Sequence, residues 1–271
     1  MSAPAPASAA TAAPEPLVLR SDRDGIVTLT LNRPRQFNAL SRAMLDALQA
    51  QLEAIATDAS ARVVVLAGAG TAFCAGHDLK EMRANHDSAF IRDVFARCGK
   101  VMETIIRIPQ PVIARVHGIA TAAGCQFVAQ CDLAVAADNT RFAVSGINVG
   151  LFCSTPAVPL SRNLSRKRAM EMLLTGEFID APTALDYGLV NRVVPPEELD
   201  ATVERLARTI LAKTPVAVAA GKRAFYRQLE LGIADAYALA VETMTCNMMS
   251  EDAAEGIDAF MARRPPQWRG R

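Results

Sequence analysis

The pattern of apolar and polar positions predicts strands and helices in alternation over the first half of the chain. Residues 25–32, GIVTLTLN, alternate in the manner of a strand with one buried face. Residues 62–68, RVVVLAG, form a continuous β-branched run, which favours a strand buried on both faces. Between them Ser41 can cap a helix with a single apolar stripe. This stripe consists of Met44, Leu45, Leu48, Leu52 and Ile55.

The same order then repeats. A helical pattern over residues 88–108 stops before Pro109, because a proline disfavours the helical conformation of the residue that precedes it. Residues 111–118, PVIARVHG, predict a strand, residues 122–130, AAGCQFVAQ, a helix, and residues 132–137, DLAVAA, another strand. This alternation indicates a largely parallel α/β core.

After Ser154 the pattern becomes mainly helical. Residues 165–176 predict a helix ending at Gly176, and residues 180–188 predict a second helix that begins at an Asp cap. We therefore expect three parts: a disordered Ala/Pro/Ser-rich tail over residues 1–16, an α/β core over 17–195 and a helical C-terminal region over 196–271.

Composition limits the function classes. Apolar residues make up 51% of the 271 residues, which is enough for a sizeable core. The net charge of +1 gives no general attraction to nucleic acid, and no stretch reaches the ~18 apolar residues of a membrane span. The six cysteines form no C-x-x-C pair and no secretory signal precedes them, so we expect a reducing cytoplasm. The three histidines lack metal-ligand spacing, so no metal site is expected.

Small residues gather at two strand-to-helix turns. The segments are residues 63–82, VVVLAGAGTAFCAGHDLKEM, and residues 111–127, PVIARVHGIATAAGCQF. Small residues let a ligand approach the backbone, and a helix N-terminus leaves N–H groups free. Two such ends that converge would provide the paired donors of an oxyanion hole. The alternative is that small residues only allow close packing of helix on strand.

Five segments, taken in order, resemble the enoyl-CoA hydratase/isomerase, or crotonase, family. The resemblance runs from about residue 17 to residue 268 and implies a spiral of ββα units with a helical C-terminal trimerisation region. It also implies a homotrimer or a dimer of trimers, and an acyl-CoA thioester as ligand, with coenzyme A as part of the substrate and no separate cofactor. The segments are NRPRQFNAL (32–40), FCAGHDLKEM (73–82), HGIATAAGCQFVAQCDLAVA (117–136), EMLLTGEFIDAPTALDYGLVNRVVP (171–195) and GIDAFMARRPPQW (256–268).

The resemblance implies that the thioester carbonyl lies between the backbone N–H groups of His77 and Ala123. Hydratases of the family carry two catalytic glutamates, and the matching positions here are Gln126 and Gly146. An amide cannot exchange a proton near neutral pH, so hydration by the usual route is in doubt. Two functions stay open: an enzyme that stabilises a thioester enolate, with hydration or isomerisation as its default reaction, and an acyl-CoA-binding protein with little hydratase activity.

A third function, dinucleotide binding, rests on GAGTAF (68–73), which lacks the third glycine and the distant acidic residue of that motif. The His77 imidazole could also transfer a proton, and Cys153 could act as a nucleophile or be a buried structural thiol. The resemblance implies further substrate-binding residues: Arg35, Phe37, Ala39, Ala75, Asp78, Leu79, Lys80, Gly124, Asn148, Phe260 and Arg263. Several of these residues also have a structural explanation. Arg35, Lys80 and Arg263 could be solvated surface charges, and Phe260 could belong to the core. Asp78 could cap a helix.

Overall fold

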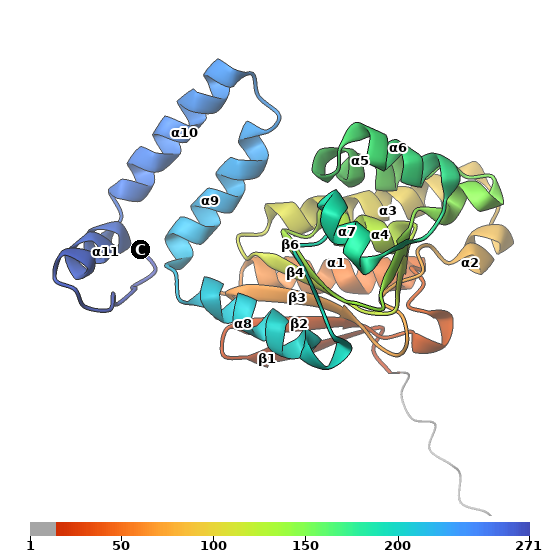
Figure 1. Cartoon of the computed structure of the whole chain (residues 1–271), viewed down its shortest axis with the longest axis horizontal. Helices are drawn as coiled ribbons and strands as arrows, with labels where there is room; N and C mark the ends of the chain where they lie inside the picture. Colours follow the sequence, from red (N-terminus) through yellow and green to blue (C-terminus); the bar gives the residue numbers. More distant parts are fainter. Residues whose placement is uncertain (1–14) are drawn as a thin grey trace, which may run out of the picture.

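The computed structural model describes residues 15–271 and contains a large sheet covered by helices on both faces (Figure 1). The strand order is β1-β2-β3-β4-β6-β9, and every neighbouring pair is parallel except β1 with β2. The predicted, largely parallel core is therefore confirmed, with an antiparallel edge strand that the sequence pattern did not indicate. The strands are β1 (Val18–Arg23), β2 (Ile26–Leu31), β3 (Val63–Gly68), β4 (Val112–Val116), β6 (Leu133–Ala137) and β9 (Arg192–Val194).

A second, three-stranded sheet lies beside the carboxyl ends of the large sheet. Its order is β5-β7-β8, and β5 continues directly from β4 after a short turn. These strands are β5 (Ile119–Thr121), β7 (Arg141–Ala143) and β8 (Ile179–Asp180). The small sheet carries the chain from the end of β4 to the start of α4 (Ala123–Gln130), and therefore positions the second of the two small-residue turns.

Helices α1 (Arg42–Ala56), α3 (Ser88–Arg107) and α4 cover one face of the large sheet, and α8 (Leu199–Leu211) covers the other. The predicted cap is confirmed, because the Ser41 hydroxyl accepts a hydrogen bond of 3.2 Å from the Met44 amide. Two apolar clusters pack against opposite faces of the sheet, which explains why β3 is buried along its whole length. The remaining helices of this part are α2 (Leu79–Ala84), α5 (Ser154–Asn163), α6 (Arg166–Thr175) and α7 (Ala181–Tyr187).

The last three helices run away from the sheet (Figure 1). They are α9 (Pro215–Gln228), α10 (Ile233–Met248) and α11 (Glu251–Met261). A largely buried ion pair of 2.7 Å between Lys222 and Asp132 joins α9 to the core, and the Tyr226 hydroxyl donates to the same carboxylate at 2.8 Å. Many large apolar side chains of this region are exposed: Phe225, Leu229, Ile233, Tyr237, Val241, Met244, Met248, Met249, Ile257, Phe260 and Met261.

The predicted disordered tail lies, apart from its last two residues, outside the described residues. The predicted boundary between residues 195 and 196 stays a prediction, and α8, the first helix after it, packs against β3, β4 and β6. No helix within residues 15–271 is both long and apolar enough to cross a membrane.

Candidate functional site

A cavity of about 570 Å³ opens where the two small-residue turns meet. Its floor contains residues of both turns, among them His77 and Ala123. One wall comes from α2 and α3, and the other comes from the segment of residues 145–156, which joins β7 to α5. The lining residues are Ala75, His77, Leu79, Met82, Phe95, Ala122, Ala123, Ser145, Gly146, Val149, Gly150, Leu151, Phe152, Cys153, Ser154, Thr155 and Pro156.

Hydrogen bonds to Leu40 fix the loop that carries His77. The Leu40 amide donates to the Gly76 carbonyl at 2.8 Å, and the Leu40 carbonyl accepts from the Asp78 amide at 3.1 Å. Leu40 therefore forms hydrogen bonds with the residues before and after His77. The N–H of His77 itself has no backbone acceptor within the described residues. Asn38, fully buried, holds the loop from below by donating to three carbonyl oxygens, one of which belongs to Phe73 at 3.1 Å.

The second N–H group belongs to Ala123, the first residue of α4. First-turn amides of a helix have no partner inside the helix, and no acceptor for this one occurs in residues 15–271. Ala122 precedes it at φ 51° and ψ −119°, which is a strained conformation for a residue with a Cβ. The Ala122 amide donates to the Ala143 carbonyl at 2.9 Å, which ties this turn to the small sheet.

The two turns touch through glycines. A Cβ placed on Gly76 would lie 3.2 Å from the Ala123 nitrogen and 2.8 Å from the Ala122 Cβ, and Gly76 has a φ of +91°. The residue before His77 thus packs directly against the Ala123 amide. Gly124 is buried against the Cys74 carbonyl, so closely that a side chain at position 124 would collide with it. Small residues here allow close packing, and they also bring both free N–H groups to one cavity.

The cavity lining has no carboxylate and no cation among the residues described. Burial lowers the pKa of the His77 imidazole to about 4, offset in part by the nearby Leu40 carbonyl. Neither nitrogen of this ring has a hydrogen-bond partner in residues 15–271, and the ring packs edge-on against Phe95 at a centroid distance of 5.2 Å. Burial raises the pKa of the Cys153 thiol. Both groups are therefore neutral at pH 7.

The structure gives different surroundings to the two positions at which hydratases carry glutamates. Gln126 lies one turn after Ala123 on α4, is 3% exposed, and its Oε1 has no hydrogen-bond partner among the described residues. Gly146 lines the cavity, and the chain folds back against it. A Cβ on Gly146 would lie 2.7 Å from Cys153 Sγ and 2.7 Å from the Leu151 carbonyl oxygen.

Of the other predicted residues, only Ala75 and Leu79 line this cavity. Asp78 has the capping role offered as its alternative: its carboxylate accepts from the Lys80 and Glu81 amides at 3.1 Å each and forms an ion pair of 3.0 Å with Arg33. Asn148 is exposed, does not line the cavity, and donates to the Gly176 carbonyl at 3.3 Å.

Five predicted residues lie elsewhere on the chain. Arg35 and Phe37 are exposed on the loop that precedes α1, next to the half-buried Ala39. Phe260, which is 85% exposed, and Arg263 lie at the end of α11, and the structure does not bring them to the cavity of their own chain.

A separate surface depression on α2 contains Lys80 and also Arg83, a cation that sequence reasoning missed. Leu79 lines both this depression and the cavity, so the two are adjacent. The pattern gave no sign of the cavity walls either, because Phe95, Leu151 and Phe152 look like ordinary apolar positions. Only the fold places them around the small-residue turns.

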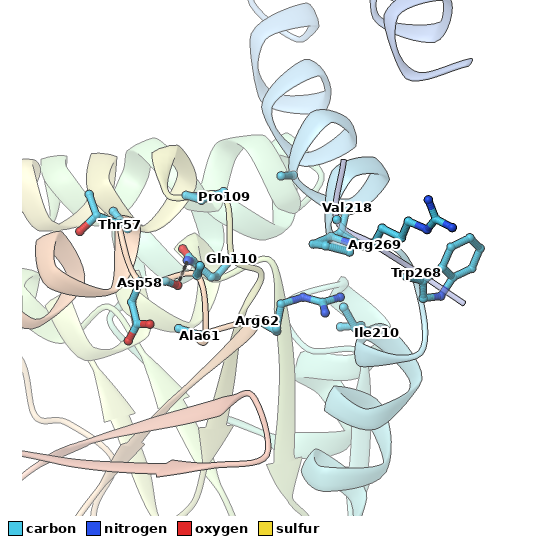
Figure 2. A pocket seen from close by; sticks show the side chains of 15 residues that line it. Thr57, Asp58, Ala61, Arg62, Pro109, Gln110, Ile210, Val218, Trp268 and Arg269 are labelled. Atoms are coloured by element: carbon cyan, nitrogen blue, oxygen red, sulfur yellow. Dashed lines mark hydrogen bonds between the residues drawn. The ribbon is translucent and has the colours of Figure 1, made fainter. Parts of the chain in front are cut away.

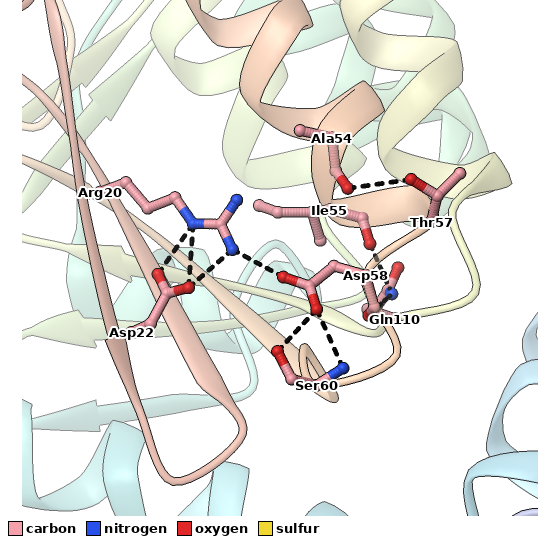
Figure 3. Close-up of polar contacts among 8 residues, drawn as sticks. All are labelled: Arg20, Asp22, Ala54, Ile55, Thr57, Asp58, Ser60 and Gln110. Atoms are coloured by element: carbon pink, nitrogen blue, oxygen red, sulfur yellow. Dashed lines mark hydrogen bonds and ion pairs between the residues drawn. The ribbon is translucent and has the colours of Figure 1, made fainter.

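A second cavity, of about 600 Å³, lies at the amino ends of β3 and β4, against α9 and the C-terminal segment (Figure 2). Arg62, Gln110 and Trp268 line it. On one side Asp58 accepts from Arg20 at 2.8 Å and from the Ser60 hydroxyl at 2.6 Å, which leaves the carboxylate fully engaged (Figure 3). This cavity contains none of the predicted site residues, and we assign the functional site to the other one.

Comparisons with known proteins identify the family. The model of the enoyl-CoA hydratase/isomerase family matches residues 21–271. A crystal structure of an enoyl-CoA hydratase from Mycobacterium smegmatis is 61% identical, covers 94% of this chain and 99% of its own, and superposes with a TM-score of 0.92. The human enoyl-CoA hydratase domain-containing protein 3 is 44% identical in its crystal structure, with 93% and 100% coverage and a TM-score of 0.91. Its relative from Xenopus laevis is 46% identical over 93% of this chain and 86% of its own length.

These relatives correct the expected location. Five vertebrate relatives carry the word mitochondrial in their names, which points away from the cytoplasm, so the cytoplasmic prediction was wrong. The buried thiols on which that prediction rested do not distinguish between compartments. The fold and the family prediction, in contrast, are confirmed by the superpositions and by the match over residues 21–271: the chain belongs to the enoyl-CoA hydratase/isomerase family.

Proposed function

We propose that the chain binds acyl-CoA thioesters in the 570 Å³ cavity, with the thioester oxygen between the amides of His77 and Ala123. The observation that carries this proposal is the pair of N–H groups that lack acceptors within residues 15–271, brought together through the Gly76 contact and open to one cavity. Such donors act on the charge that develops on the oxygen, and each is worth on the order of 10²–10³ in rate.

The phosphates of coenzyme A need cations to bind them. Since coenzyme A is part of the substrate, we propose no separate cofactor. Lys80 and Arg83 lie in the depression next to the cavity, and Leu79 borders both. The phosphates would therefore bind beside α2 while the acyl group enters the cavity. The exposed Arg35 is a further candidate, because the family resemblance implies a basic side chain near the nucleotide at this position.

The reaction that this site supports is polarisation of the thioester towards its enolate. A specific observation favours the second candidate, binding with little hydration. No carboxylate lines the cavity among the described residues, and Gly146 has no room for a side chain. The lining residues described therefore supply neither carboxylate of the two-glutamate mechanism of hydration, and any proton transfer needs another group.

We further propose a homotrimer or a dimer of trimers. The exposed apolar side chains of α9 to α11 support this, since such a surface is larger than a monomer usually leaves in water. In such an assembly Phe260 and Arg263 could contact the ligand of a neighbouring copy. Light scattering at micromolar concentration tests the proposal, and a monomer would contradict it.

The thioester site is tested by ligands that differ in one group. Butyryl-CoA should bind at least about fivefold more tightly than S-butyl-CoA, a thioether without the carbonyl oxygen, because two hydrogen bonds of about 0.5–1.5 kcal/mol each are lost. Free butyrate should bind far more weakly than either. Equal affinities for the thioester and the thioether in calorimetry would overturn the oxyanion assignment.

Ala123→Pro provides the matching variant, because proline removes the N–H at the first position of α4, where the helix itself makes no use of it. The variant should bind butyryl-CoA and S-butyl-CoA equally. Circular dichroism and thermal unfolding check its fold. If the variant still prefers the thioester, Ala123 does not hold its oxygen.

A further inference from the structure

The proposed acyl cavity has apolar walls that continue to the surface. Leu79, Met82 and Phe95 form one wall. Val149, Leu151 and Phe152 form the other and are 61%, 48% and 44% exposed. Large apolar side chains in a row at a cavity mouth mark a surface that an apolar ligand covers. The floor of the same cavity holds the two free amides, which fixes the occupant as the acyl part of the bound thioester.

Charge is missing from these walls. The polar side chains in the lining are the hydroxyls of Ser145, Ser154 and Thr155, together with the neutral His77 and Cys153. The cations Lys80 and Arg83 line the adjacent depression, which shares only Leu79 with the cavity. A carboxylate held between these half-exposed apolar walls loses part of its hydration and gains no charged partner, which is unfavourable.

We infer that this cavity selects hydrocarbon acyl chains and rejects chains that end in a carboxylate, and that Leu151 and Phe152 are the residues that set this selectivity. The inference rests on the proposed function, since it concerns the acyl part of a bound thioester. It adds the substrate class, which neither the family nor the two free amides determines.

The test compares hexanoyl-CoA with adipyl-CoA by calorimetry on the full-length wild-type protein. The two chains have the same length and differ only in the terminal carboxylate. Hexanoyl-CoA should bind at least about tenfold more tightly, because the carboxylate of adipyl-CoA loses part of its hydration and gains no partner. Equal affinities would overturn the inference while leaving the proposed function intact. Failure of both ligands to bind would overturn the proposed function, and the inference with it.

Variants test the residue assignment. Leu151→Arg and Phe152→Arg place a cation at the mouth, and each should lower the hexanoyl-to-adipyl preference at least about threefold. The new arginine also attracts the phosphates of coenzyme A. This attraction is the same for both ligands, so it does not affect the ratio of their affinities. Val158→Arg is the matched control: Val158 is 51% exposed on α5 but outside the cavity lining, so the preference should stay as in wild type.

Two outcomes would contradict this assignment. One is a preference that stays unchanged in both mouth variants, and the other is an equal fall in the control. Thermal unfolding of each variant shows whether it is folded, and the wild-type comparison of the two thioesters stands without any variant.

Discussion

The sulfur of Cys153 occupies the space that a side chain at position 146 would need, since a Cβ on Gly146 would lie 2.7 Å from it. The Leu151 carbonyl oxygen closes the same space from a second direction at 2.7 Å. The Leu151 amide also donates to the Gly146 carbonyl at 2.9 Å, so the segment is bound to the residue that it crowds. A glutamate at position 146 would therefore force the segment around Cys153 and Leu151 to move before its carboxylate could take part in a reaction.

Gly146→Ala should destabilise the protein by about 1–3 kcal/mol, the usual effect of overpacking. Combination with Cys153→Ala should recover part of this loss, because the sulfur is gone while the Leu151 carbonyl remains. Urea unfolding of the two single variants and the double variant measures the coupling. Gly99→Ala in α3 is the control: a Cβ there meets nothing within 4 Å, so no loss is expected. Additive effects at 146 and 153 would refute the shared space.

Gln126→Glu tests the other position. The new carboxyl would be buried, since Gln126 is 3% exposed and its Oε1 has no hydrogen-bond partner among the described residues, so we expect its pKa to be raised above the ordinary value of about 4.3. A raised folded-state pKa means that the variant approaches wild-type stability at pH 4 and loses stability as the pH rises to 8. Crotonyl-CoA hydration should increase only slightly, because the second glutamate is still missing. Urea unfolding at both pH values and a hydration assay measure the two effects; ordinary hydratase rates in the wild type would show that another residue transfers the proton.

His77 makes stability depend on pH in a narrow window. Its folded-state pKa of about 4 lies below the ordinary value of 6.5, so the unfolded chain binds more protons between these values. Stability from this residue is present above pH 6.5 and is lost as the pH falls towards 4, by on the order of 1.4 kcal/mol per pKa unit. Urea unfolding of wild type and His77→Phe across this range should show a smaller slope in the variant. Burial lowers the pKa of His117 as well, so some slope remains.

The parts of the fold that local patterns predicted are those with strong periodicity. Ser41 before an apolar stripe gave the start of α1, and the β-branched run of residues 62–68 gave β3. The edge strand β1 was missed because five of its six residues are exposed or half-buried and show no clear alternation. Long-range contacts were beyond any local pattern. Nothing in the sequence says that Cys153 packs on Gly146, or that Phe95 of α3 faces the loop of residues 149–152.

The ion pair between Lys222 and Asp132 should dominate the attachment of α9 to the core. Its side chains are 6% and 14% exposed, and the Lys222 ammonium also donates to the Ile105 and Gln110 carbonyls. Asp132→Ala should cost about 3–5 kcal/mol, because it leaves a buried charge unpaired. Glu103→Ala, which breaks an exposed pair with Arg107, should change stability by less than about 1 kcal/mol. Thermal and urea unfolding of both variants decide between these values, and equal effects would contradict the prediction.

The free amides of His77 and Ala123 are backbone atoms, and this has a consequence for redesign. Their positions depend on Gly76, on the strained turn at Ala122 and on the hydrogen bonds to Leu40, and on none of the side chains of the cavity walls. Libraries that vary positions 151 and 152 would therefore leave the donor pair in place, so that new acyl specificities could be selected without rebuilding the part of the scaffold that holds the carbonyl.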